Sequence, residues 1–142
     1  MKLNKQVPNL ELCKKLKELG YPQEGLFWYR VDHRVDNDSI VYVSKRKPNY
    51  EAMWTANLIV APTVAEMGEW LPQIIEIGQV KYQMFITVAL DKQFFVVYAN
   101  EHNYEDNAPF PIKMCHNEAD ARAKMLIYLF ENKLISLEGK DE

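Results

Sequence analysis

A basic and aromatic cluster lies in the stretch from residue 45 to residue 54. Its members are Lys45, Arg46, Lys47, Tyr50 and Trp54. Cationic side chains bind phosphate and aromatic rings stack on bases, so this combination is suited to gripping a nucleotide-like anion. Three consecutive basic residues in a loop are also common in segments that are simply solvated. We interpret this loop, with Trp28 on the aromatic strand before it, as the leading candidate for a ligand-binding surface.

A second set of residues has side chains that can bind a metal or transfer protons. Its members are His33, Asp36, Asp38, His102 and His116. The stretch 32–38 lacks the glycine and the distal glutamate of a calcium loop, and turn chemistry accounts for most of it. Cys115 precedes His116 directly, but adjacency in sequence does not place a thiol against an imidazole.

Short catalytic motifs are absent from the sequence. It has no Walker A loop, dinucleotide fingerprint, GxSxG, HExxH or CxxC pair. The absence of these motifs argues against catalysis, so we expect no catalytic residue, no metal and no cofactor. The alternative is a metal-dependent hydrolase or nucleotide-processing enzyme built on the histidines and aspartates above.

Length and composition favour one domain over residues 1–142, with a frayed polar tail at 136–142. At 48% apolar residues the chain can bury a core without disulfides, so Cys13 and Cys115 are expected to be reduced and partly buried. No stretch has the length of a signal peptide or a membrane span, which predicts a cytoplasmic protein that does not enter the membrane. Residues 1–50 carry a charge of +4 and residues 51–142 a charge of −7, so a basic front half is available to an anion or nucleic acid.

Three segments carry helix signals. Asn9 caps a helix that ends at Gly20, and Thr63 with Glu66 forms the capping-box spacing of a short helix over 64–71. Gly68 within that helix indicates close packing against a neighbouring backbone. Asn117 caps a helix over 117–135, the element around which we expect the chain to pack. Its apolar residues recur at steps of three and four and predict one buried face, made of Ala119, Ala123, Leu126, Ile127, Phe130 and Leu134.

Strands are predicted at 26–31 and 40–45, which pair most simply with each other, and at 57–62. The clearest β element is a hairpin of strands 81–90 and 93–100. Both of its faces are largely apolar, so either other elements of the chain cover both faces or a second subunit covers one of them. Of these two, we expect the second subunit, in a homodimer. The predicted fold class is α+β, with a mainly antiparallel sheet of four to five strands packed by the N-terminal and C-terminal helices and the short 63–71 helix at an edge.

Three segments in order resemble a family of small uncharacterised proteins encoded in bacteriophages and prophages. They are NLELCKKLKELGYPQEGLFWY, TVAEMGEWLP and NEADARAKMLIYLFENKLI, and the last is the most specific. The family has no assigned activity, so the resemblance implies a phage-linked accessory protein in a bacterial cytoplasm and no catalytic residue. The leading hypothesis is a non-enzymatic protein that binds a host or phage protein, a nucleic acid or a small anionic ligand. A purely structural dimeric module is the third alternative.

Overall fold

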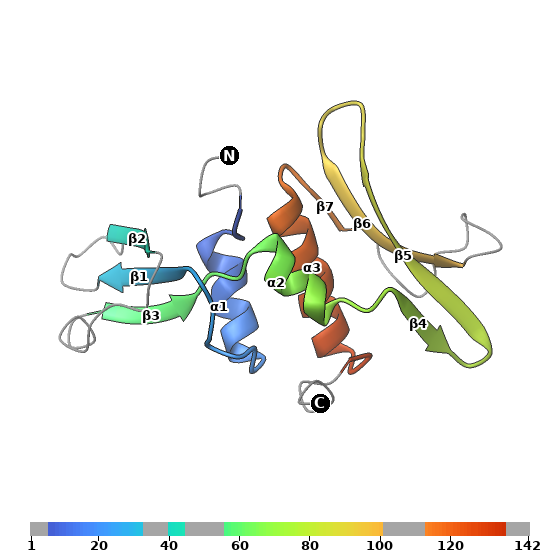
Figure 1. Cartoon of the computed structure of the whole chain (residues 1–142), viewed down its shortest axis with the longest axis horizontal. Coiled ribbons are helices and arrows are strands. Elements are labelled where there is room, and N and C mark those ends of the chain that lie inside the picture. Colours follow the sequence, from blue (N-terminus) through green and yellow to red (C-terminus); the bar gives the residue numbers. More distant parts are fainter. Residues whose placement is uncertain (1–5, 33–39, 45–55, 101–112, 136–142) are drawn as a thin grey trace.

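The computed structural model describes residues 6–32, 40–44, 56–100 and 113–135 of the chain (Figure 1). The helices are α1 (Leu10–Glu18), α2 (Val64–Trp70) and α3 (Glu118–Glu131). The strands are β1 (Trp28–Asp32), β2 (Ile40–Ser44), β3 (Ala56–Val60), β4 (Ile74–Ile77), β5 (Val80–Val88), β6 (Phe94–Asn100) and β7 (Lys113–Cys115). The predicted α+β class is confirmed, as are the pairing of β1 with β2 and the β5–β6 hairpin.

The helices form a layer between two antiparallel sheets. One sheet has the strand order β2-β1-β3 and the other the order β4-β5-β6-β7. Figure 1 shows α1 next to the three-stranded sheet, and α2 and α3 between α1 and the four-stranded sheet. The strands are therefore divided between two sheets and not gathered in one, and α2 lies against α3 and not at a sheet edge. None of the described helices is long and apolar enough to span a membrane.

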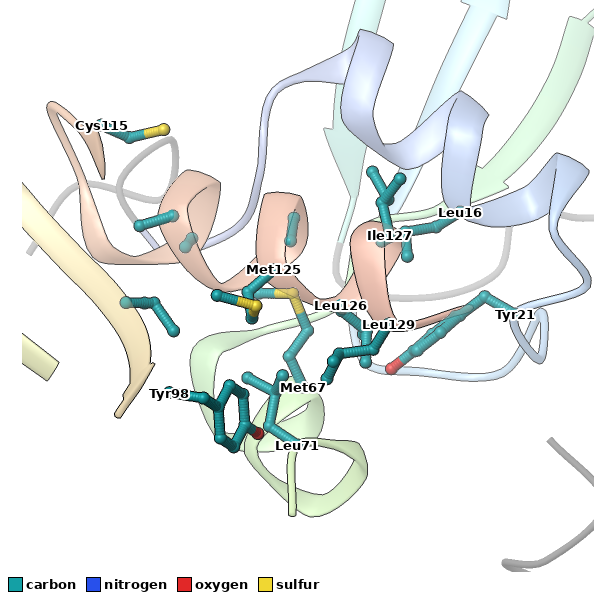
Figure 2. Close-up of a cluster of buried hydrophobic side chains, with 14 of the residues drawn as sticks. Leu16, Tyr21, Met67, Leu71, Tyr98, Cys115, Met125, Leu126, Ile127 and Leu129 are labelled. Atoms are coloured by element: carbon teal, nitrogen blue, oxygen red, sulfur yellow. The ribbon is translucent and has the colours of Figure 1, made fainter. Parts of the chain in front are cut away.

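Helix α3 is the centre of the main core, and it is buried on more than the one predicted face. Ala121, Met125 and Leu129 have no exposed surface, although they lie outside the predicted stripe. Figure 2 shows why: Ile127 points toward Leu16 of α1, while other α3 side chains point toward α2 and the four-stranded sheet. A helix enclosed by neighbours on several sides has to be apolar on several sides. One polar stripe of the helix is left to solvent, and its members are Asp120, Lys124, Tyr128 and Glu131. Glu118 and Arg122 are also partly exposed, near the start of the helix.

A smaller core joins α1 to the three-stranded sheet. It contains Tyr29 and Cys13, whereas Trp28 belongs to the main core. Successive side chains of a strand point to opposite faces, so β1 connects the two cores. Burial raises the pKa of the Cys13 thiol and of the Tyr29 hydroxyl well above their usual ranges. The Tyr29 hydroxyl donates a hydrogen bond of 2.7 Å to the carbonyl of Pro8, which satisfies it inside the core.

All three helices begin at the same end of the molecule (Figure 1). The predicted caps are present, since the side chains of Asn9, Thr63 and Asn117 each accept a backbone N–H in the first turn of their helix. Asp120 joins two of these helix starts. One of its carboxylate oxygens accepts the backbone N–H of Asn9 at 2.8 Å, and the other accepts the side-chain amide of Asn117 at 3.0 Å.

Gly68 is closely packed, but its neighbour is a side chain and not a backbone. A Cβ atom at this position would lie 3.1 Å from Nη1 of Arg122, which crosses from α3. Arg122 also lies 3.4 Å from the carboxylate of Glu118, one helical turn earlier. The absence of a side chain at residue 68 therefore gives the guanidinium room between α2 and α3.

The face of the four-stranded sheet that points away from the helices is partly apolar. The strand register places Phe85 opposite Val97 and Phe95 opposite Met114 on this face. The first three are half-buried and Met114 is 48% exposed, whereas Val96 and Tyr98 on the other face are fully buried. The expectation that a second subunit covers the outer face stays a prediction.

Candidate functional site

The basic and aromatic residues that were predicted to bind a ligand fall into two groups. Lys45, Arg46, Lys47, Tyr50 and Trp54 lie outside the described residues. Trp28 is 4% exposed and its indole N–H donates to the carbonyl of Gly25 at 3.2 Å. Burial gives Trp28 a role in packing the main core, and its assignment to a ligand site stays a prediction.

The residues selected for metal or acid-base chemistry are also divided. His33, Asp36, Asp38 and His102 lie outside the described residues, and His116 is exposed just before the cap of α3. Within the described part of the chain, no group of three or more histidine, cysteine, aspartate and glutamate side chains is placed to hold a metal ion. The geometry thus gives no support to the hydrolase alternative among these residues.

The two cysteines are poor nucleophiles in this fold. Burial raises the pKa of the Cys115 thiol, although a hydrogen bond with Lys124 acts in the opposite direction. Burial is also the main cause of the raised pKa of Cys13, and the nearby Asp120 carboxylate adds to it. A nucleophilic cysteine needs a lowered pKa, because the thiolate is the reactive form. Neither thiol meets that condition.

A small basic groove lies along the exposed stripe of α3. It has a volume of about 250 Å³. We call it the basic groove, and it is lined by Lys15 of α1, Lys113 of β7, and Lys124, Tyr128 and Glu131 of α3, above Leu12 and Ile127. Three elements thus each bring one lysine to the same hollow, and α1 is distant in the sequence from the consecutive elements β7 and α3.

The charges around the basic groove are unbalanced. The described residues of its lining carry three ammonium groups and one carboxylate, that of Glu131, which leaves a formal charge of +2. The Nζ atom of Lys113 lies 5.3 Å from the centre of the Tyr128 ring, which holds this cation at the groove by a cation-π contact. Lys15 and Lys124 are exposed, so their ammonium groups are accessible to a ligand. An anion in the groove would relieve the repulsion among the three cations.

This site was not predicted from the sequence because its lysines are separated. Lys15 lies on the predicted first helix, Lys113 lies outside every predicted helix and strand, and Lys124 lies on the predicted last helix. Four-residue spacing does place Lys124 next to Tyr128 on a helix. The approach of Lys15 and Lys113 depends on how α1 and β7 pack against α3, which no local pattern encodes.

Comparison with protein-family models, with curated proteins and with solved structures finds no match to this chain. The resemblance to small phage-encoded and prophage-encoded proteins therefore stays a prediction, and the site is interpreted from its own chemistry.

Proposed function

We propose that this protein is a non-enzymatic binding protein for a phosphate-bearing anion, acting as a phage- or prophage-related accessory protein, and that the basic groove is its binding site. The convergence of Lys15, Lys113 and Lys124 on one hollow is the observation that carries this proposal. Lysine ammonium groups are strong point-charge donors to phosphate oxygens, and each offers three N–H donors. The hollow has room for one phosphate group, and this group belongs either to a small molecule or to a nucleic-acid backbone.

The lining offers binding groups without a catalytic constellation. Lysines can fix a phosphate, but the described lining contains no histidine or cysteine, and its one carboxylate is the exposed Glu131. General acid-base catalysis needs a proton-transferring group positioned against the reacting atoms. Binding without turnover is therefore the activity that these residues support best.

The test compares two triple lysine variants with the same change of charge. The first, the groove variant, has glutamine in place of Lys15, Lys113 and Lys124. The second, the control variant, has glutamine in place of three exposed lysines outside the described lining of the groove, Lys81, Lys92 and Lys133. Binding of a fluorescein-labelled single-stranded oligonucleotide is followed by anisotropy, and binding of inorganic pyrophosphate by calorimetry. We expect the groove variant to bind at least tenfold more weakly and the control variant to bind like the wild-type protein.

Salt dependence and a third variant separate the remaining outcomes. For an oligonucleotide ligand, each lost phosphate contact lowers the slope of log affinity against log salt by about 0.7. Equal weakening in both triple variants would show a non-specific charge effect and would overturn the assignment to the groove. A third variant replaces Lys45, Arg46 and Lys47 by glutamine. If this variant lost binding and the groove variant bound like the wild-type protein, the binding site would be assigned to the 45–54 loop.

A further inference from the structure

A larger cavity lies where the helices begin. It has a volume of about 560 Å³, within the range of small-molecule sites. Its apolar walls are Val64 and Ala65 of α2 and Phe94 of β6. Its polar groups come from Gln6, which precedes α1, and from the start of α3, where His116 and Glu118 contribute. The cavity shares no lining residue with the basic groove.

Two of the polar residues at the cavity are engaged in the fold. Thr63 Oγ1 accepts the backbone N–H of Glu66 at 3.1 Å as the cap of α2. The Asn117 side chain accepts the backbone N–H of Asp120 at 2.8 Å and donates to its carboxylate at 3.0 Å. These two side chains hold the helix starts in place, and the carbonyl of Gln6 accepts the backbone N–H of Val64 at 3.3 Å. The charged side chain of Glu118 is therefore the group of the described lining that is best suited to recognise a ligand.

Among the described residues of the lining, Glu118 alone carries a carboxylate. Its side chain is 31% exposed, and one oxygen lies 3.4 Å from Nε of Arg122. That contact leaves capacity for another donor, because an ionised carboxylate has about four acceptor positions. A cationic donor gains most here, since hydrogen bonds between charged groups are about twice as strong as those between neutral groups.

The electrostatics of this end of the molecule disfavour an anion. Helix starts carry a partial positive charge of about half a unit each. Three carboxylates already lie in the first turns of α2 and α3, those of Glu66, Glu118 and Asp120. They compensate the helix dipoles, and the described residues of the lining have a formal charge of −1, counted with histidine neutral. The Phe94 ring adds a second group that attracts cations.

We propose that this cavity is a second ligand site, which binds a small molecule that has an apolar ring system and one protonated amine. The ring system packs against Val64 and Phe94, and the ammonium group donates to the carboxylate of Glu118. This proposal does not depend on the anion site, because the two hollows have separate linings and opposite charge.

The test uses three probes that share one ring and differ in charge. Tryptamine is cationic, 3-methylindole is neutral and indole-3-acetate is anionic, and binding of each is followed through the backbone amide signals of ¹⁵N-labelled full-length protein. We expect tryptamine to bind most tightly and to shift the signals of Ala65 and Glu118. Indole-3-acetate is expected to be the weakest of the three at these signals.

Two variants with matched controls identify the site. Glu118→Gln should weaken tryptamine binding about tenfold and leave 3-methylindole binding unchanged, since the substitution removes the negative charge, and with it the ion pair with Arg122, but keeps the size of the side chain. Glu76→Gln on β4, an exposed position outside the cavity, is its control and should change neither probe. Ala65→Trp should fill the cavity and abolish binding of both probes, whereas Glu69→Trp, at an exposed position of the same helix, should not.

The proposal has two results that would overturn it. One is an absence of tryptamine-dependent shifts at Ala65 and Glu118 in the wild-type protein. The other is indole-3-acetate binding at these positions as tightly as tryptamine, which would assign the cavity to anions. The isosteric Glu118→Gln variant keeps the test valid if Ala65→Trp fails to fold.

Discussion

Replacement of Asp120 by alanine should separate the start of α1 from the start of α3. The Asp120 carboxylate accepts the backbone N–H of Asn9 at 2.8 Å and the side-chain amide of Asn117 at 3.0 Å. Residues 9 and 120 are 111 positions apart in the sequence, so the first of these bonds is a tertiary contact. It joins the first helix of the chain to the last.

The magnitude follows from the exposure of these contacts. Hydrogen bonds to a charged group contribute about 1.5–3 kcal/mol, and the exposed bond to Asn9 belongs at or below the lower end because water can replace the carboxylate. A carboxylate in the first turn of a helix adds about 0.3–1 kcal/mol through the helix dipole. We therefore expect Asp120→Ala to lower the free energy of unfolding by about 2 kcal/mol. Asp120→Asn, which keeps an acceptor oxygen, should cost less.

Urea unfolding followed by far-UV circular dichroism and by tryptophan fluorescence gives the measurement. Trp28 is buried at the start of β1 and Trp70 lies at the end of α2, so the fluorescence reports on both sides of the helix layer. Glu11→Ala is the control, because Glu11 is also in a helix first turn but its side chain is 82% exposed and its ion pair, with Lys14, lies within the same helix. If Asp120→Ala and Glu11→Ala both changed stability by less than about 0.5 kcal/mol, the argument that Asp120 joins the two helices would be refuted.

Two further predictions concern buried hydroxyl and thiol groups. Tyr98→Phe should lower the free energy of unfolding by about 1 kcal/mol or slightly more, because the Tyr98 hydroxyl donates to the carbonyl of Pro72 at 2.6 Å; urea unfolding measures the loss, and an unchanged midpoint would contradict it. Stability should also fall as the pH rises above about 9, the ordinary pKa of a thiol. Burial raises the pKa of Cys13, so the unfolded chain loses this proton first and is favoured at alkaline pH. Thermal unfolding from pH 8 to pH 11 tests this, and Cys13→Ala should reduce the slope near pH 9; the same slope in both proteins would exclude Cys13 as its cause.

Local signals in the sequence determined the helices and the main hairpin. The caps at Asn9, Thr63 and Asn117 were predicted from residue type and spacing, and each is present in the structure. The pairing of the strands predicted at 26–31 and 40–45 was also expected from their closeness along the chain, and β1 pairs with β2 in the structure. Such features depend on residues that are a few positions apart, because a capping hydrogen bond and the alternation of side chains along a strand both involve near neighbours in the sequence.

Two short strands and the full burial of α3 were not predicted. β4 and β7 have four and three residues, and each needs a neighbouring strand to define it. β7 lies between the predicted hairpin and the predicted last helix, where no strand was predicted, and it brings Lys113 to the basic groove. Similarly, the apolar residues of α3 beyond the predicted face, such as Met125, are buried only because neighbouring elements enclose the helix on several sides.

What the sequence by itself determined is the α+β class, the helix caps and the pairing of strands that are close along the chain. What only the tertiary structure decided is the division into two sheets, the common end at which the helices begin, and the two hollows. The physical reason is range: capping and strand pairing across a short turn are local. The meeting of Lys15 with Lys113, and of Val64 with Glu118, depends on packing between segments far apart in the chain. Both proposed sites therefore consist of residues that only the fold brings together.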